Sequence, residues 1–468
     1  RLAGRVKREP ILVIMGNPPY SGISANTNKW TEKLLKEDLD GAQSYYTVDG
    51  KPLGERNPKL LQDDYVKFLR FAQWKIHKAG QGIVAMITNH GYLDNITFRG
   101  MRQSLMKTFN EIYILNLHGN SLKKETAPDG SKDENVFDIR QGVAISLFVK
   151  NNNFSLNETK VYFADLYGIR KLKYDFLCNN QVDSIKWVEI KPSSKFYSFS
   201  PINRKGEEIY NKFKTITGIF RIYSSGIKTH RDQFAYDFEK DALLRRIMQF
   251  RDTSIPDNII MLSYNIHDTR DWKLSPNRKV LDNLEKWQDY VHECIYRPFD
   301  NRYLYYHAYI IELPRYDVMH HMLNDNLGLI TSRQIDKSGT LPIFITNTLI
   351  DTHSITSATS ISYLFPLYLY PDKKELNLLN YMEQKREPNI DQTILLKLQE
   401  VYDQLISPEQ LLQYIYAVLS SPLYQQTYAD FLKFDFPRVP FTADGALFQQ
   451  MAALGKRLVD LHLLRSPE

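Results

Sequence analysis

In the first 150 residues, short apolar runs alternate with amphipathic segments. Apolar runs bounded by turn residues are typical of buried strands. The runs cover residues 11–15, 83–88, 112–117 and 143–149. Residues 61–76 and 98–109 have the apolar spacing of helices. The alternation predicts an α/β layer with right-handed crossovers, in which residues 11–15 form a buried strand of a parallel sheet.

Other segments of the chain have different patterns. Residues 21–58 are polar and show no clear element, and a stretch of that kind is usually functional or mobile. Residues 166–215 are irregular, with lysines scattered among aromatic residues. Residues 218–372 predict short strands broken by polar turns. Examples of these expected strands are residues 219–223, 303–306, 328–331 and 363–370.

From about residue 376 the pattern becomes helical. Residues 407–410 read Ser-Pro-Glu-Gln, which predicts a capping box with proline at the first helical position. Residues 421–422 (Ser-Pro) open the next expected helix, and residues 445–464 form the last one.

Composition and charge exclude several classes of protein. The 468 residues carry 60 basic and 54 acidic side chains, a net charge of +6, which is compatible with a phosphate-bearing partner but does not require one. The two cysteines, Cys178 and Cys294, are too few for a disulfide scaffold or a structural zinc site. We therefore expect a reduced intracellular compartment. No apolar run approaches the roughly 20 residues that a membrane helix needs.

The first apolar run ends in Asn17, Pro18, Pro19 and Tyr20, the candidate catalytic residues. Ligands of open α/β sheets lie beyond the carboxyl ends of the strands. There, the side-chain oxygen of Asn17 and the backbone carbonyl of Pro18 could accept both protons of an exocyclic amine such as adenine N6. Tyr20 could stack on a base flipped out of the duplex. The alternative is a rigid turn that holds a packed tyrosine.

Three segments together resemble the second half of an amino-methyltransferase of the adenine-N6 DNA class. They are residues 17–20, residues 82–88 (GIVAMIT) followed by Arg102, and Val136 with Phe137 before residues 141–145 (QGVAI). The resemblance implies that Phe137 stacks on the target adenine opposite Tyr20, and that S-adenosyl-L-methionine is the cofactor. The alternative for Phe137 is a core residue beside a strand.

Motifs after residue 215 resemble the specificity region of single-polypeptide type I (ISP) restriction–modification enzymes of bacteria. They are residues 226–232 (GIKTHRD), 296–302 (YRPFDNR), Arg315 with Met319 and His320, residues 414–419 (YIYAVL) and residues 436–440 (FPRVP). Members of this family join a nuclease, a helicase-like ATPase, a methyltransferase and a recognition domain. The resemblance implies a bacterial cytoplasmic enzyme with two partners, double-stranded DNA and the remaining N-terminal portion of the same polypeptide.

The resemblance fails at the cofactor motifs, a glycine-rich turn and an acidic residue that this family places before the catalytic motif. No such arrangement precedes Asn17. We therefore expect a C-terminal fragment that does not methylate alone, with the main cofactor motifs outside this chain. The expected fold is a partial Rossmann-like α/β domain followed by a mixed α+β recognition domain with a helical end. Its expected parts are residues 1–165 (methyltransferase half), 166–215 (connection), 216–375 (target recognition) and 376–468 (helical part).

Several polar side chains near the predicted turns of the recognition region are candidates for DNA contact. They are Lys228, Arg231, Arg297, Arg302, Arg315, Arg333 and Gln334. Arginine pairs with guanine and glutamine with adenine in the major groove, and any basic side chain can neutralise a phosphate. The alternative for each is a solvated or ion-paired arginine. Arg297 and Arg302 flank Asp300 and could form an internal ion-pair network.

The sequence thus predicts site-specific adenine-N6 methylation of duplex DNA with base flipping. One alternative is a DNA-binding specificity module without turnover in this chain. Another is a protein-glutamine methyltransferase, although such an enzyme needs no recognition region. We expect no metal site, because His320, His321 and His353 fit no familiar zinc spacing.

Overall fold

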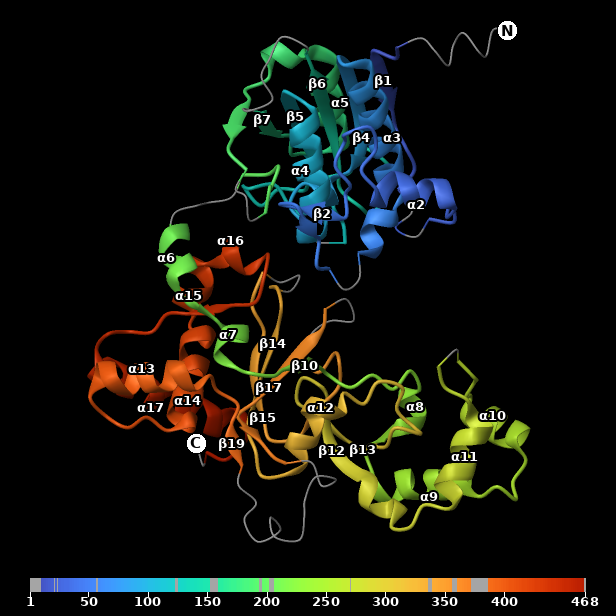
Figure 1. The fold of residues 1–468 in the computed structure, drawn as a ribbon, viewed down its shortest axis with the longest axis vertical. Coiled ribbons are helices and arrows are strands. Elements are labelled where there is room, and N and C mark those ends of the chain that lie inside the picture. Colours follow the sequence, from blue (N-terminus) through green and yellow to red (C-terminus); the bar gives the residue numbers. More distant parts are fainter. Residues whose placement is uncertain are drawn as a thin grey trace. The chain divides into compact units, whose positions relative to one another are not determined.

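The computed structural model describes most of the chain. The described residues are 10–20, 22, 24–55, 58–122, 125–151, 159–192, 196–201, 206–269, 271–335, 339–355, 360–371 and 386–466. The chain divides into a first unit, residues 1–203, and a second unit, residues 204–468 (Figure 1).

A six-stranded mixed sheet forms the centre of the first unit, in the order β1-β4-β6-β5-β7-β8. Its strands are β1 (Val13–Gly16), β4 (Gly82–Asn89), β5 (Glu111–His118), β6 (Val143–Lys150), β7 (Lys160–Asp165) and β8 (Val188–Ile190). Strands β1 and β4 are parallel, as are β5 and β7, whereas β6 and β8 run antiparallel to their neighbours. All four predicted strands of this unit are present, but the sheet is mixed rather than parallel.

Strand β1 lies at the edge of the sheet and not in its interior. It pairs with β4 on one side, and the side chains of Val13 and Met15 are 59% and 77% exposed. The expectation of a buried strand at residues 11–15 is therefore wrong, although its parallel pairing is confirmed. Proteins usually cover an apolar edge strand of this kind.

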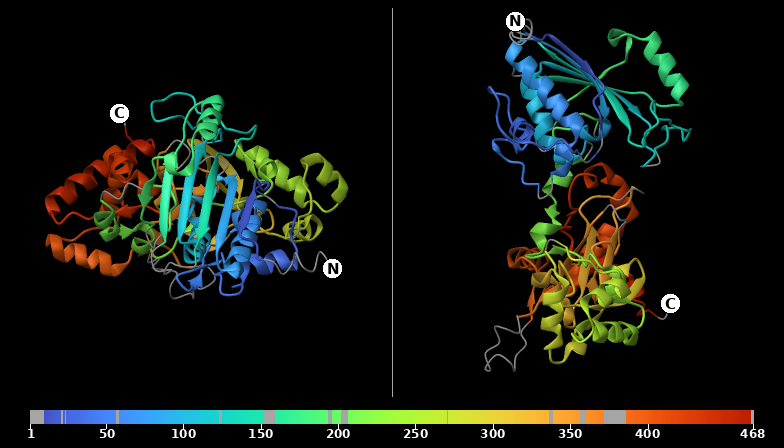
Figure 2. Two further views of the ribbon diagram at one scale, coloured as in Figure 1. Left: turned by 90° about the horizontal axis from the view of Figure 1, so that it is seen from above. Right: turned by 90° about the vertical axis from the view of Figure 1, so that its right-hand side faces the viewer.

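Helices cover both faces of this sheet (Figure 2). They are α3 (Asp64–Ala79), α4 (Arg99–Thr108) and α5 (Arg170–Asn179). Leu69, Ala72 and Ile76 of α3 recur at helical spacing and are buried against the sheet with residues of α4. Phe176 and Leu177 of α5 pack on a smaller cluster at the other face.

The polar stretch over residues 21–58 contains elements that the sequence pattern did not indicate. They are α2 (Lys29–Lys36), β2 (Thr47–Val48) and β3 (Lys51–Pro52). The side chain of Asn28 accepts hydrogen bonds from the backbone of Trp30 and Thr31 and so caps α2. Only a short apolar face of α2 is buried, Leu34 and Leu35, so the helical periodicity is too brief to be evident.

The expected connection at residues 166–215 is divided between the units. Helix α5 packs on the first unit, and β8 extends its sheet by pairing with β7. Helix α6 (Glu207–Lys212) and β9 (Lys214–Thr215) belong to the second unit.

Two four-stranded sheets lie in the second unit, in the orders β10-β17-β14-β15 and β11-β13-β12-β16. Their strands are β10 (Ser224–Ser225), β11 (Tyr236–Asp237), β12 (Val291–Arg297), β13 (Asp300–Tyr305), β14 (Gly328–Ser332), β15 (Ile343–Thr346), β16 (Leu349–Ile350) and β17 (Ser362–Pro366). Two short pairs join β18 (Tyr368–Leu369) with β19 (Glu387–Pro388), and β9 with β20 (Arg438–Val439). The predicted strands at residues 303–306, 328–331 and 363–370 overlap β13, β14, and β17 with β18.

The same region also contains helices that the sequence pattern did not indicate. They are α7 (Ile216–Ile219), α8 (Asp232–Ala235), α9 (Lys240–Arg251), α10 (Asp257–Tyr264), α11 (Leu274–Asp282) and α12 (Tyr316–Met319). The expected strand at residues 219–223 is wrong, because α7 ends at Ile219 and Phe220 makes only an isolated bridge to Ile390. Leu243, Ile247 and Phe250 of α9 are fully buried.

The C-terminal part is helical, as predicted. Its helices are α13 (Gln392–Tyr402), α14 (Pro408–Ser420), α15 (Pro422–Thr427), α16 (Ala429–Leu432) and α17 (Gly445–His462). The predicted capping box is confirmed: Ser407 Oγ accepts from the Gln410 N–H at 3.1 Å, and Gln410 Oε1 accepts from the Ser407 N–H at 2.9 Å. Helices α14 and α17 pack closely at Gly455, where an added Cβ would lie 1.9 Å from the Gln413 carbonyl oxygen.

The expected boundary near residue 375 does not separate two hydrophobic cores. Leu329 and Phe365 of the β14–β17 sheet share one core with Leu411 of α14 and Val459 of α17. Within the described residues, no helix combines the length and the apolar character needed to cross a membrane.

Candidate functional site

Four strands of the first sheet run in the same direction, and their carboxyl ends lie along one edge of the sheet. Strands β4 and β5 both run antiparallel to β6, while β1 is parallel to β4 and β7 is parallel to β5. The carboxyl ends of β1, β4, β5 and β7 therefore meet at this edge. Open α/β sheets bind their ligands at such an edge, and it is where Asn17 follows β1.

The Asn17–Tyr20 bend presents its amide to solvent. Asn17 and Pro19 are exposed, Pro18 is buried and Tyr20 is half-buried. The Tyr20 hydroxyl donates a hydrogen bond to Asn17 Oδ1 at 3.1 Å. Burial raises the pKa of the Tyr20 phenol, so the hydroxyl keeps its proton at neutral pH. An amide oxygen has two lone pairs, so Asn17 can accept a second hydrogen bond in this arrangement.

Phe137 lies in the loop between β5 and β6, at the same edge of the sheet. Phe137 and Tyr20 both pack against one small cluster, which consists of Leu115, Leu117, Val136 and Val143. The backbone N–H of Phe137 donates to Asn135 Oδ1 at 2.9 Å. Phe137 also lines an open cavity of about 560 Å³, together with Asn135 and Arg140. The sequence-predicted pair of rings is thus brought to one cluster, with Phe137 only partly buried.

A fully buried ion pair holds this loop against α5. Lys173 Nζ lies 2.7 Å from Asp133 Oδ1, and both side chains are 0% exposed. Lys173 also donates to the carbonyl oxygens of Leu117 and Glu134, each at 2.6 Å. Sequence analysis missed this pair, because Lys173 lies among the surface-like lysines of residues 166–215 and its partner is 40 residues away.

Lys228 and Arg315 are the most accessible of the predicted DNA-contacting residues. Both are exposed, and neither side chain forms an ion pair with another described residue. The Lys228 backbone exchanges two hydrogen bonds with Leu313, at 3.1 and 3.0 Å. Two segments far apart in the sequence therefore pair at Lys228 and Leu313, and Arg315 follows Leu313 by two residues.

Arg231 is buried and uses its guanidinium internally. It donates to the carbonyl oxygens of Thr229 and Ile310 at 2.9 and 2.5 Å, and it lies 3.8 Å from the centroid of the Trp272 ring. Burial lowers the pKa of its guanidinium, although the Glu312 carboxylate opposes that shift. These contacts favour the internal role that the sequence left open.

Arg297 and Arg302 also have internal partners. Arg302 makes two hydrogen bonds to Asp300, at 2.9 and 2.7 Å, whereas Arg297 pairs with Asp351 at 2.8 Å. Both guanidinium groups stack on the ring of Tyr296. The expected ion-pair network is therefore present around Arg302, while Arg297 has a different partner.

The comparisons with known proteins concern the whole chain. A family model described as the Type ISP C-terminal specificity domain matches residues 218–468, more than half of the chain. The chain belongs to this Type ISP family. A comparison with curated proteins found no match.

Solved structures resemble this Type ISP chain over 98% of its length. A DrdV–DNA complex has 24% identity and a TM-score of 0.72. The ATP-dependent Type ISP restriction–modification enzyme LlaBIII, bound to DNA, has 25% identity and a TM-score of 0.72. A nuclease-deletion mutant of the Type ISP enzyme LlaGI, with a DNA substrate mimic, has 24% identity and a TM-score of 0.68. The chain spans only 45%, 30% and 42% of these three chains, respectively.

The two remaining candidates of the Type ISP domain contact the segment just after α16. Arg333 Nε lies 3.2 Å from Asp435 Oδ1, and Gln334 Nε2 donates to the Phe434 carbonyl oxygen at 3.3 Å. Base contact by either side chain therefore stays a prediction.

The three histidines whose spacing does not fit a zinc site each have a hydrogen-bond partner in the Type ISP domain. His320 Nδ1 lies 2.6 Å from the Tyr316 carbonyl oxygen, and His353 Nδ1 lies 2.7 Å from that of Ser360. His321 Nδ1 accepts from the Tyr370 N–H at 3.0 Å. Burial, followed by the charge of His320, lowers the pKa of His321 to about 4.

Proposed function

We propose that this chain supplies two parts of a Type ISP restriction–modification enzyme: the target-base half of a DNA adenine-N6 methyltransferase, and the domain that reads the DNA sequence. The observation that carries the proposal is the Asn17–Tyr20 bend, whose Asn17 side chain is exposed at the carboxyl edge of a sheet, with the Phe137 loop packed on the same cluster as Tyr20. The Type ISP specificity match over residues 218–468 adds the reader.

The bend would hold the amino group of an extruded adenine. Asn17 Oδ1 and the Pro18 carbonyl would accept its two N–H protons, which draws the nitrogen lone pair away from the ring and makes it available for methylation. The Tyr20 hydroxyl bonded to Asn17 Oδ1 orients this acceptor. Base-flipping enzymes hold the base between aromatic or apolar side chains, and Tyr20 and Phe137 are two rings that lie at this edge.

S-adenosyl-L-methionine would supply the methyl group. The described residues fit the target side of such a site better than the cofactor side, because the glycine-rich turn and acidic residue expected for the cofactor do not precede Asn17. The exposed apolar side chains of Val13 and Met15, on a strand with one open edge, support the proposal that another part of a longer polypeptide continues this sheet and holds the cofactor.

Duplex DNA is the proposed partner of the second unit. LlaBIII and LlaGI, which resemble this chain over nearly its whole length, were solved with DNA or a DNA mimic. The exposed charges of Lys228 and Arg315 supply a first pair of phosphate contacts, and such contacts position a protein on DNA without reading its sequence. A specificity domain after the catalytic half argues against a glutamine methyltransferase.

The test is Asn17→Ala in a longer polypeptide that contains this chain together with its cofactor half. We expect methyl transfer to be abolished and DNA affinity to stay largely intact, because the lost oxygen, which accepts from the Tyr20 hydroxyl, would bind the target amine and not the rest of the duplex. Asn179→Ala, which removes an exposed amide on α5, is the matched control and should retain full activity. Methyl transfer by Asn17→Ala at the parent rate would overturn the catalytic assignment.

The specificity match also supports the second candidate, a reader module without turnover in this chain. The isolated 468-residue chain should then bind duplex DNA with a steep salt dependence and should not transfer methyl groups. Turnover by the isolated chain with cofactor and DNA would exclude this candidate.

A further inference from the structure

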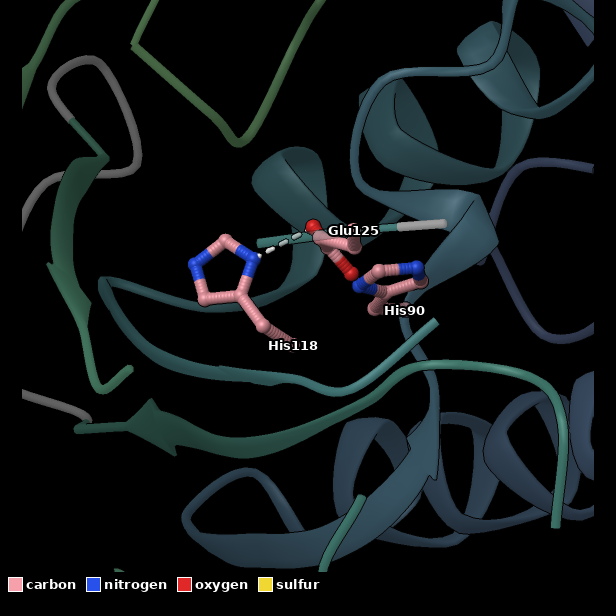
Figure 3. A group of neighbouring side chains, drawn as sticks. All are labelled: His90, His118 and Glu125. Atoms are coloured by element: carbon pink, nitrogen blue, oxygen red, sulfur yellow. Dashed lines mark hydrogen bonds and ion pairs between the residues drawn. The ribbon is translucent and has the colours of Figure 1, made fainter. Parts of the chain in front are cut away.

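A second polar group occupies the carboxyl edge of the first sheet, apart from the Asn17–Tyr20 bend. It consists of His90, which directly follows β4, His118, the last residue of β5, and Glu125 in the loop after β5. One side-chain donor atom from each of the three lies within 4.8 Å of the others. Figure 3 shows the Glu125 carboxylate between the two imidazole rings. Both histidines are buried, at 8% and 5% exposure.

The outward nitrogen of each ring is held by an oxygen. His118 Nε2 lies 2.7 Å from Asp165 Oδ1, at the end of β7. His90 Nδ1 lies 3.1 Å from Asn116 Oδ1. Histidines that bind metals almost always donate their second N–H to such an oxygen, which fixes the tautomer and orients the ring. In this arrangement the inner nitrogens, His118 Nδ1 and His90 Nε2, carry lone pairs.

The neighbouring amides also favour lone pairs on the inner nitrogens. The backbone N–H of His118 donates to Asn116 Oδ1 at 3.2 Å, which fixes the orientation of that amide. Its NH₂ group therefore lies 3.3 Å from His118 Nδ1, and the NH₂ group of Asn120 lies 3.2 Å from His90 Nε2. Both amides can only donate from nitrogen.

The Glu125 carboxylate requires a positive charge beside one of these lone pairs. Glu125 Oε1 lies only 2.7 Å from His118 Nδ1, and its Oε2 accepts from the Asn120 backbone N–H at 2.9 Å. A proton on His118 Nδ1 satisfies this contact as it stands. Two donor atoms of one tetrahedral zinc ion lie about 3.3 Å apart, so a bound ion requires the two groups to separate by roughly 0.6 Å.

We propose that His90, His118 and Glu125 bind a divalent transition-metal ion of the zinc type. Two imidazole nitrogens and one carboxylate oxygen form a donor set that zinc accepts, with water completing the tetrahedron. Magnesium and calcium prefer sites made only of oxygen. The ion would join the ends of β4 and β5 to the loop that begins at Gly119.

Packing limits how far the site can adjust. Gly142 lies directly against the His90 ring, and an added Cβ at this position would lie 2.3 Å from His90 Cε1. The ring therefore cannot turn toward β6. The competing occupant is a proton that makes His118 an imidazolium between Glu125 and Asp165, and the experiment below separates the two.

The test uses the full 468-residue chain, prepared without a histidine tag, stripped with EDTA and then dialysed against zinc. We expect one zinc per chain by plasma mass spectrometry after gel filtration, and d–d absorption bands of a tetrahedral site when cobalt replaces zinc. Glu125→Gln should lose the bound metal. The Asp165 carboxylate contacts the outer nitrogen of His118 and orients the ring. Asp165→Asn should therefore weaken zinc binding about 10- to 100-fold.

The matched control is His77→Gln, because His77 lies on α3, outside the cluster, and its loss should leave one zinc bound. Glu125 is less buried than the histidines, so Glu125→Gln is expected to fold, which circular dichroism would verify. The parent chain should also melt at a higher temperature with zinc than without, and Glu125→Gln should not. A chain that stays metal-free in zinc, or retention of zinc by Glu125→Gln at the parent level, would overturn the proposal and assign the contact to a proton.

Discussion

Replacement of Lys173 by methionine tests how the Phe137 loop is held. The ammonium of Lys173 is fully buried, pairs with Asp133 at 2.7 Å and donates to two backbone carbonyl groups. Asp133 in turn accepts from the backbone N–H groups of Gly119 and Gly168, at 2.6 and 2.8 Å. Methionine keeps most of the side-chain volume but removes the charge and all three donated hydrogen bonds.

The expected loss is about 3–5 kcal/mol, the usual cost of removing one partner of a buried ion pair. The loss should be local at first, because the pair ties one loop to one helix. Hydrogen exchange followed by mass spectrometry measures it directly: at about 1.4 kcal/mol for each factor of ten, the Gly119 and Gly168 amides should exchange roughly 100- to 4,000-fold faster.

Two further variants show whether charge is the cause. Asp133→Asn in the Lys173→Met background removes the unpaired carboxylate, so it should recover part of the protection. Lys171→Met removes an exposed lysine of the same helix and should change nothing. Exchange in Lys173→Met within threefold of the parent would refute the reasoning.

Three other predictions concern the second unit. The pKa of His321 is lowered to about 4, so the folded state keeps this side chain neutral at a pH where the unfolded chain binds a proton. The free energy of unfolding should therefore fall by on the order of 3 kcal/mol as the pH falls from 6.5 toward 4. In urea melts measured over this pH range, His321→Gln should show a smaller fall. Gly455→Ala should lower the melting temperature, because the added Cβ would overlap the Gln413 carbonyl oxygen. The overlap would push α14 and α17 apart at a cost of about 1–3 kcal/mol or more. An unchanged melting temperature would contradict this packing. The logarithm of the association constant for DNA falls linearly with the logarithm of the salt concentration, and the double variant Lys228→Ala, Arg315→Ala should reduce this slope by about 2. An unchanged slope would show that neither residue contacts phosphate.

Local signals in the sequence predicted the elements that depend on neighbouring residues. The capping box at residues 407–410 is one case, because both of its hydrogen bonds form within one turn of helix. The Asn17–Tyr20 bend is another, since two prolines end a strand wherever that strand lies. The helical spacing of Leu243, Ile247 and Phe250 in α9 is also present in the sequence, but it lies among short apolar runs that predict strands.

Burial and ion pairing depend on contacts that the sequence does not contain. Residues 11–15 are apolar, as in a buried strand, yet Met15 is exposed because β1 has a partner on one side only among the described residues. Lys173 resembles its exposed neighbours in sequence and is buried because Asp133 neutralises it. Arg231 is a candidate for DNA contact by sequence, because the sequence does not reveal its internal partners. In the structure it contacts Trp272 and two carbonyl groups.

The most direct test of the central claim is the chemical identity and position of the methyl group. DNA from cells that express a longer polypeptide containing this chain should be sequenced for modified bases. The account predicts N6-methyladenine at one defined sequence, and its disappearance when Asn17 is replaced by alanine. Methylation of cytosine instead of adenine, or an unchanged adenine pattern in the Asn17→Ala variant, would contradict it.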